Sequence, residues 1–227
     1  MVDTATAPSG NAWTRLANSN PIMEFIDVTL RGSGQVIFMD NPLTGLLNFV
    51  AMFVGAARGG TSFEVAIGSV IGTMVSTAMA YLLKANRGNL KAGIYGFNGM
   101  LVGACLPTFL AANPLMWLFL VVGSAVSTIV IMAVANFLAP YKMPAFTFPF
   151  VLTCWLIVLY AKKITGLPPS AGGPLPEGGF NFITAGLNSV SQVWFVADWV
   201  AGIIFLVALA VESIWCFALT AVGAFLG

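Results

Sequence analysis

The 227-residue chain is 59% hydrophobic and only 7% charged, with a formal net charge of +1 and no histidine. Soluble domains carry about 25% charged residues, so this composition indicates an all-α polytopic membrane protein. The near-neutral charge implies no nucleic-acid partner, and the lack of histidine argues against a Ser-His-Asp triad, a histidine proton relay or a histidine metal site.

The first 33 residues are polar and contain no apolar core typical of a signal peptide. Within them, "MEFIDVTLRG" at 23–32 predicts a short amphipathic segment that lies at the membrane interface. The basic cluster at Lys84, Arg87 and Lys91 predicts a cytoplasmic loop by the positive-inside rule, which also makes the N-terminus cytoplasmic. We expect a multi-pass protein of a bacterial inner or plasma membrane.

Seven apolar runs follow, at 43–57, 65–83, 92–112, 115–139, 148–161, 193–211 and 214–227. A membrane-crossing helix needs about 20 residues, a length that 65–83 and 115–139 approach or exceed. The other early runs are short or, at 92–112, interrupted by glycines and a proline, which predicts broken or half-spanning helices. The Gly/Pro-rich residues 163–188 predict an exposed loop.

The segment "PAFTFPF" at 144–150 is too proline-rich for a helix interior and too apolar for a loop in water. Irregular backbone at membrane depth is tolerated where it lines a cavity. Pro149 cannot donate a backbone hydrogen bond and leaves carbonyls free, Thr147 adds a hydroxyl, and three phenylalanines add ring faces. The pattern therefore predicts a cavity lining; the alternative is a proline-capped helix start with core aromatics.

An internal repeat pairs residues 35–54 with 192–211 at a constant offset, so that Gln35 matches Gln192 and Phe38 matches Phe195. At a slightly shorter offset, "AIGSVIG" at 66–72 matches "AVGAFLG" at 221–227. Such repeats indicate two related halves, often of inverted topology, around a central site. The alternative is chance similarity between membrane sequences of restricted composition.

The repeat predicts a domain organisation with an incomplete second half. Residues 34–162 form the first transmembrane repeat and 189–227 the start of the second, while "GFNGMLVG" and "PAFTFPF" have no second copy before Gly227. We therefore expect a truncated second repeat, either because the chain is a fragment or because it is naturally short.

Three stretches together resemble the urea transporter family: "GSGQVIFMDNPLTGLLNFV", "GIYGFNGMLVG" and "MPAFTFPF", within about residues 24–161. The resemblance implies a trimeric channel in which each subunit has its own pore between two inverted repeats. It also implies a narrow slot walled by phenylalanine rings and edged by backbone and side-chain oxygens. The implied partners are urea, lipids, and either identical subunits in a homotrimer or other membrane chains.

Urea is flat and neutral, with four N–H donors and one carbonyl acceptor, so a selective path needs flat apolar walls and a row of acceptors. The predicted pore residues are Gln35, Phe38, Phe97, Asn98, Phe146, Thr147, Phe148, Gln192 and Phe195. Ordinary packing or helix capping is the alternative for each of them. We interpret Asn41-Pro42 as a helix start, and we place Glu212 at a turn between two spans without a functional role.

Three functions remain open at this point. The leading one is facilitated diffusion of urea, and the second is a non-conducting accessory or structural subunit built on the same fold. The third, an ammonia channel, is disfavoured because such pores use a histidine pair, and an aquaporin is disfavoured because no Asn-Pro is followed by Ala. The three widely spaced cysteines are typical of core residues, and we predict no enzyme activity, metal or cofactor.

Overall fold

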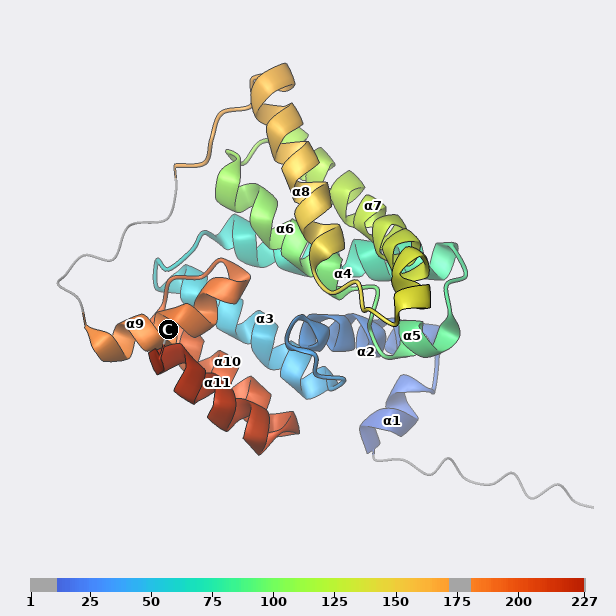
Figure 1. The fold of residues 1–227 in the computed structure, drawn as a ribbon, viewed down its shortest axis with the longest axis horizontal. Helices are drawn as coiled ribbons and strands as arrows, with labels where there is room; N and C mark the ends of the chain where they lie inside the picture. Colours follow the sequence, from blue (N-terminus) through green and yellow to red (C-terminus); the bar gives the residue numbers. More distant parts are fainter. Residues whose placement is uncertain (1–11, 172–180, 227) are drawn as a thin grey trace, which may run out of the picture.

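The computed structural model describes residues 12–171 and 181–226, and this part of the chain is almost entirely helical (Figure 1). Its elements are α1 (Ala12–Ala17), α2 (Pro21–Gly34), η1 (Gln35–Ile37), α3 (Pro42–Ala57), α4 (Phe63–Leu82), α5 (Arg87–Lys91), α6 (Phe97–Phe109), α7 (Pro114–Leu138), η2 (Ala139–Tyr141), α8 (Phe148–Tyr160), η3 (Ala161–Thr165), α9 (Phe182–Ser191), η4 (Gln192–Trp194), α10 (Trp199–Glu212) and α11 (Ile214–Leu226). The predictions for residues 1–11, 172–180 and Gly227 lie outside the described residues.

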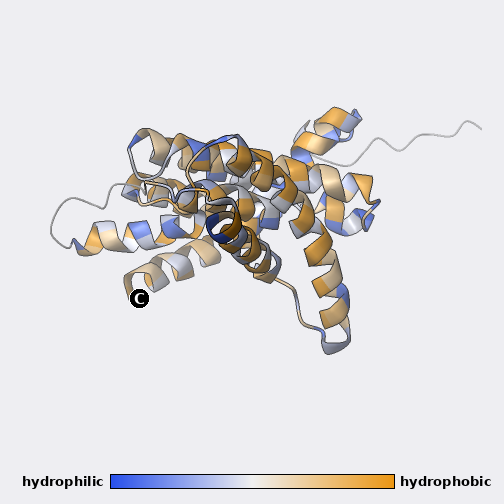
Figure 2. Cartoon of the chain, turned by 90° about the horizontal axis from the view of Figure 1, so that it is seen from above, coloured by the Kyte–Doolittle hydropathy of each residue, from blue (hydrophilic) through white to orange (hydrophobic). Residues whose placement is uncertain are grey.

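The helices have the length and apolar character of membrane spans. Within the described residues, α4, α7 with η2, and α8 with η3 are each long and apolar enough to cross a bilayer. Two further spans result if α2–α3 and α9–α10, bent by 75° and 70° at short breaks, each count as one broken span. Hydrophobic residues run along most helices (Figure 2), which confirms the prediction of an all-α membrane protein.

Helices α4 and α6 approach closely because small residues line their contact. A Cβ atom added to Gly72 would collide with the carbonyl group of Gly99, and one added to Gly99 would collide with the carbonyl oxygen of Gly72. Beside this contact, the buried Ser76 hydroxyl of α4 donates to the Ser124 carbonyl of α7 at 2.7 Å. Small residues and interhelical hydrogen bonds are the usual means of helix association in lipid.

Helix α3 lies between the α4–α8 group and the C-terminal helices (Figure 1) and packs against α10. The two run antiparallel, because the start of each meets the end of the other. The Asn41 amide donates to the Glu212 carboxylate at 2.7 Å, and the Arg58 guanidinium donates to Asp198 at 2.9 Å. Glu212 does lie at the turn between α10 and α11, where this contact gives it a structural partner.

The two bent units share local geometry at the positions that the sequence repeat pairs. In each, a short 3-10 turn ends at a phenylalanine in the left-handed region, Phe38 with φ 60° and Phe195 with φ 61°. Each of these residues donates its N–H to the preceding glutamine carbonyl at 3.0 Å. An N-cap side chain, Asn41 or Asp198, then starts the second helix.

Two features of the C-terminal part differ from the sequence prediction. The predicted loop 163–188 is wrong at its end, because α9 begins at Phe182, where the Asn181 side chain accepts the N–H groups of Ile183 and Thr184. The helix that precedes η4 therefore spans Phe182–Ser191. The predicted run 193–211 is divided, because residues 195–198 separate η4 from α10.

The predicted interfacial segment 23–32 belongs to a longer helix. Residues 21–34 form α2, which begins at a proline and is capped by the Asn20 side chain. One face of α2 is buried, including Val28, and the helix packs against α3 and α4. The first bent unit therefore begins before residue 34.

Candidate functional site

A cavity of about 540 Å³ lies beside the irregular segment that precedes α8. Its walls come from η1, the loop and turn around α5, the start of α6, the end of α7 and residues 144–146. Four predicted pore residues meet there: Gln35, Phe38, Phe97 and Phe146. The other lining residues are Asn86, Asn89, Ile94, Tyr95, Ile131, Met132, Ala135, Asn136, Pro144 and Ala145.

The proline-bracketed segment has the irregular backbone that its sequence predicts. Residues 143–147 are not helical, and α8 begins at Phe148 with Pro149 in its first turn. Phe146 has a φ of 46°, in the left-handed region that bulky residues rarely adopt. Its ring meets that of Phe38 edge to face, with centroids 5.6 Å apart. Both side chains are more than half exposed, so the pair borders the open cavity.

Gln35, which lines the same cavity, is buried. Its amide nitrogen donates to the Ala92 carbonyl at 2.8 Å, which ties η1 to the segment that leads into α6. The amide oxygen can also accept hydrogen bonds.

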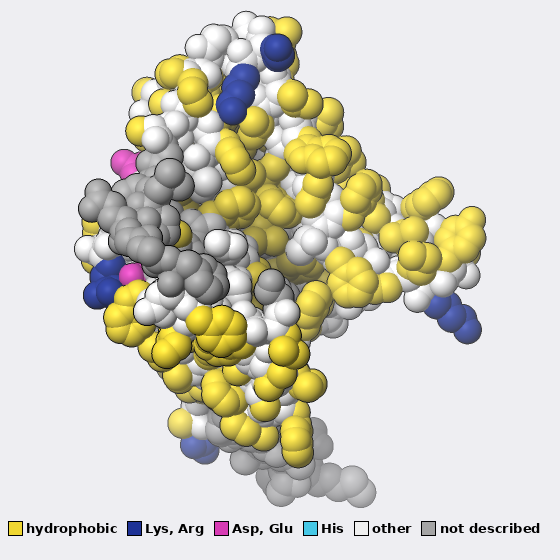
Figure 3. Space-filling model, turned by 60° about the vertical axis from the view of Figure 1, so that its left-hand side comes forward, with side chains coloured by type: hydrophobic (Ala, Val, Ile, Leu, Met, Phe, Trp, Pro, Cys, Tyr) yellow, Lys and Arg dark blue, Asp and Glu magenta, His cyan; other side chains and the backbone are white. Residues whose placement is uncertain are grey.

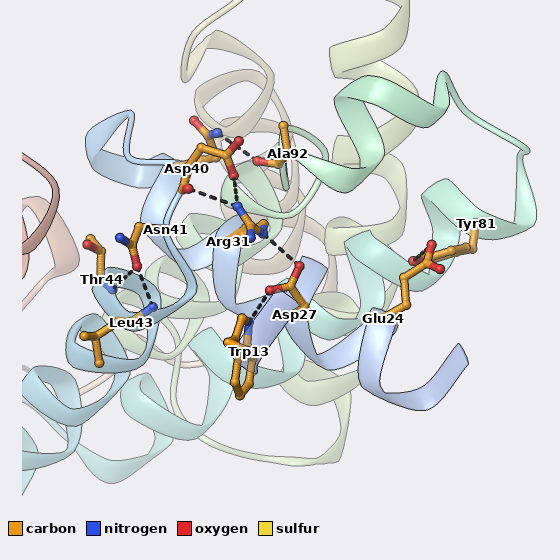
Figure 4. A network of polar contacts seen from close by, with 11 residues as sticks. Trp13, Glu24, Asp27, Arg31, Asp40, Asn41, Leu43, Thr44, Tyr81 and Ala92 are labelled. Atoms are coloured by element: carbon orange, nitrogen blue, oxygen red, sulfur yellow. Dashed lines mark hydrogen bonds and ion pairs between the residues drawn. The ribbon is translucent and has the colours of Figure 1, made fainter. Parts of the chain in front are cut away.

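A network around Arg31 fixes the turn that follows Phe38 (Figure 4). The Arg31 guanidinium donates to the Asp40 carboxylate at 2.7 Å, to the Asp40 carbonyl at 3.0 Å and to Asp27 at 2.8 Å. The Trp13 indole also donates to Asp27, at 2.6 Å. Because the same guanidinium nitrogen contacts both the side chain and the backbone of Asp40, the residues after Phe38 are anchored to α2.

The remaining predicted pore residues lie outside this cavity lining. Thr147 is half-buried at the start of α8 and Phe148 is exposed, whereas Asn98 is fully buried with its amide bonded to backbone groups of residues 146 and 150. Gln192 is exposed. Phe195 belongs to a second aromatic group, with ring centroids 6.1 Å from Phe109 and 6.2 Å from Phe150.

The sequence interpretation missed several polar residues of the wall. Asn136 interrupts the apolar run of α7, and Tyr95 lies within the "GIYGFNGM" motif, so both carried a recognisable signal. Asn86 and Asn89 lie in a basic, polar stretch that looks like an ordinary loop. All the lining residues are uncharged, which suits a neutral solute that both donates and accepts hydrogen bonds.

Comparisons with known proteins identify a family. A family model described as urea transporter matches residues 26–227. Urea transporter 1 of Ovis aries and that of Capra hircus are each 34% identical to the chain over 131 residues, which is 56% of this chain and 33% of each relative. Urea transporter 1 of Mus musculus is 33% identical over 132 residues, 57% of this chain and 33% of that protein.

The matched stretch thus spans about a third of the length of these curated relatives. The family model covers most of the chain, and the resemblance seen in the sequence motifs is confirmed. The matched family is one of transporters, which agrees with the prediction that the chain is not an enzyme. The chain belongs to the urea transporter family.

Proposed function

We propose that this chain forms part of a channel for facilitated diffusion of urea, without ion or nucleotide coupling. The observation that carries the proposal is the meeting of Gln35, Phe38, Phe97 and Phe146 at one uncharged cavity. The rings offer flat walls for the faces of urea. The Gln35 amide oxygen is an acceptor for its N–H groups, which matters because an unpaired polar group in an apolar site costs about 2–7 kcal/mol.

The slot continues from this cavity along α6 and α8 in our proposal. The Phe38–Phe146 pair forms one end, and the Phe195, Phe150 and Phe109 rings form the next part of the wall. Thr147 and Phe148 lie on the chain between Phe146 and Phe150, where the hydroxyl supplies a further acceptor. Gln192 and Phe195 take the roles that Gln35 and Phe38 have in the first unit.

The two bent units form an inverted repeat in this proposal, with α2–η1–α3 equivalent to α9–η4–α10. The matched left-handed phenylalanines, the matched N-caps and the antiparallel contact of α3 with α10 support it. We further propose a homotrimer, or assembly with other membrane chains, in a bacterial plasma membrane with a cytoplasmic N-terminus.

A second candidate function is a non-conducting accessory subunit on the same fold. One observation favours it: every lining residue of the cavity comes from residues 35–146, while Gln192 and Phe195 lie elsewhere. A slot built between two repeats needs contributions from both.

Urea flux into proteoliposomes separates the two functions. We expect the folded chain to raise urea permeability above that of protein-free vesicles, with no dependence on ion gradients. Phe38→Leu should lower permeability about two- to tenfold, because an aromatic pair is worth about 0.5–1.5 kcal/mol. Phe182→Leu, which changes an exposed ring on α9, is the matched control. Absence of urea flux from correctly folded protein would support the accessory subunit.

A further inference from the structure

We infer that Asn98 is a positioning residue for the candidate site: its side-chain amide bridges the break before α8 and so sets the position of the Phe146 ring and the selectivity of the slot. The inference rests on the proposed function for its consequence in transport. Its structural part, the bridge, can be tested without transport.

The Asn98 amide contacts two backbone groups on either side of Pro149. Its nitrogen donates to the Phe146 carbonyl at 3.3 Å, and its oxygen accepts the N–H of Phe150 at 3.0 Å. Asn98 itself is fully buried in the first turn of α6. Both halves of the amide are therefore used on the broken segment, rather than on a solute in the cavity.

These two backbone groups would bond to each other if α8 began one residue earlier, with Phe146 as its N-cap. In a continuous α-helix the N–H of residue 150 donates to the carbonyl of residue 146. Here the Asn98 amide stands between them and satisfies both, and the first helical bond is instead Val151 N–H to the Thr147 carbonyl at 3.1 Å. A side chain inserted into the helical ladder is a known cause of helix breaks.

The helix does not continue backwards past this gap. Pro149 lies in the first turn of α8, where proline is tolerated, but in a helix continued past Phe146 its ring would clash with the carbonyl of Ala145. Phe146 instead has a left-handed φ, and Asn98 is the partner of both the Phe150 N–H and the Phe146 carbonyl. At membrane depth, groups left unpaired cost several kcal/mol each.

The bridge has a direct consequence at the cavity. Phe146 carries the carbonyl that Asn98 holds, has the left-handed φ of 46°, and places its ring 5.6 Å from that of Phe38. Fixing this one peptide group fixes the spacing of the two rings. Asn98 therefore acts on transport through Phe146 and does not touch urea.

Two substitutions separate the halves of the bridge. Asn98→Leu keeps the number and branching of the side-chain heavy atoms and deletes both hydrogen bonds. Asn98→Asp keeps the acceptor for the Phe150 N–H but removes the donor to the Phe146 carbonyl. The matched control is Asn48→Leu, which removes another fully buried amide, bonded to the Ser33 carbonyl at 3.0 Å and absent from the cavity lining.

The first readout is the ratio of urea to methylurea permeability in proteoliposomes that contain equal amounts of folded protein. We expect Asn98→Leu and Asn98→Asp to lower this ratio and Asn48→Leu to leave it unchanged. A residue that only packs the core would alter the yield of folded protein but not this ratio. If Asn98→Leu does not fold, the Asp variant decides this readout.

The second readout is hydrogen exchange at the amide of Phe150, which needs no transport. It should become about five- to tenfold faster in Asn98→Leu, the effect of losing one net hydrogen bond, and stay slow in Asn98→Asp and Asn48→Leu. Unchanged exchange in Asn98→Leu would overturn the bridge. Altered exchange with an unchanged permeability ratio would overturn its role in selectivity. Absence of urea flux from the unmodified protein would refute the proposed function, and exchange alone would then decide the bridge.

Discussion

Phenylalanines account for three of the five non-glycine residues with positive φ in the described part of the chain: Phe38, Phe146 and Phe195. Left-handed backbone costs a residue with a Cβ about 1–2 kcal/mol, and bulky residues rarely adopt it. Such conformations persist only where the surroundings impose them, and they gather at functional sites. All three belong to the predicted pore set, so the backbone strain is concentrated where we place the walls of the slot.

The first residue-scale prediction concerns the hydroxyl of Thr147. Thr147→Val keeps the volume and removes a hydrogen-bonding group, which should raise the barrier for urea by about 1–3 kcal/mol if the hydroxyl replaces lost water. Each 1.36 kcal/mol corresponds to about a tenfold change in rate. Stopped-flow urea uptake by proteoliposomes measures the change.

The control for this prediction lies on the same helix. Thr153 is buried, and its hydroxyl donates to the Pro149 carbonyl at 2.7 Å, so Thr153→Val removes a hydroxyl engaged within α8. Equal uptake by Thr147→Val and the unmodified protein would remove Thr147 from the path.

The sequence located some residues of the cavity and misjudged others for a physical reason. Gln35 and Phe38 were found because the repeat marks them, and Phe146 because prolines bracket it. The role of Asn98 could not be predicted from the sequence, because a side-chain amide can form hydrogen bonds either with a solute or with unpaired backbone groups. Only three-dimensional contacts show that its partners are the backbone groups of residues 146 and 150.

At the scale of elements, the α3–α10 pair depends on contacts at its two ends. Asp198 has two tasks at one end: its carboxylate caps α10 by accepting the Ala201 N–H at 2.8 Å and pairs with Arg58 at 2.9 Å. Its side chain is only 7% exposed, whereas that of Arg58 is 42% exposed. The equivalent cap in the first unit is the neutral Asn41.

This difference leads to a double-mutant prediction. Arg58→Met should destabilise the protein by about 1–2 kcal/mol, between the values for exposed and buried ion pairs, because it leaves the Asp198 charge without its partner. Asp198→Asn keeps the helix cap but removes the charge. In that background, Arg58→Met should lower the free energy of unfolding much less. Unfolding in mixed detergent micelles measures both, and equal costs would show that the pair is not coupled.

Long helices were predicted from the sequence more accurately than short ones. Helices α4 and α7 were anticipated within a few residues because long apolar runs leave few alternatives. Helix α9 was missed because it is short and follows a Gly/Pro-rich stretch, although Asn181 is a typical cap. The break at 195–198 was hidden because "FVAD" contains neither glycine nor proline and is mostly apolar.

At the scale of the whole molecule, charged side chains are few and hydrophobic ones cover much of the face seen in Figure 3, where Lys and Arg lie toward its edges. The antiparallel α3–α10 pair places residues 58–62 near the start of α10 and residues 40–41 near its end. If this pair lies across the bilayer, its two ends face opposite compartments.

Single-cysteine labelling tests this arrangement. With Cys105, Cys154 and Cys216 replaced by alanine, Ser62→Cys and Ser213→Cys should react with a membrane-impermeant maleimide from opposite sides of the membrane. These positions lie at opposite ends of the pair, one after α3 and one after α10. Labelling of both from the same side would contradict the inverted arrangement of the two units.

The end contacts of α3 also have a consequence for biosynthesis. Arg58 and its partner Asp198 are 140 positions apart, and Asn41 and Glu212 are 171 apart. At a translation rate of about 5–20 residues per second, the interval between the synthesis of α3 and that of α10 is on the order of ten seconds. During that interval the Thr44 hydroxyl, which finally donates to the Ala208 carbonyl, has no such acceptor. The α3 surface that finally contacts α10 is therefore open, during synthesis, to the α10 of a neighbouring copy, which is the situation from which a domain swap forms.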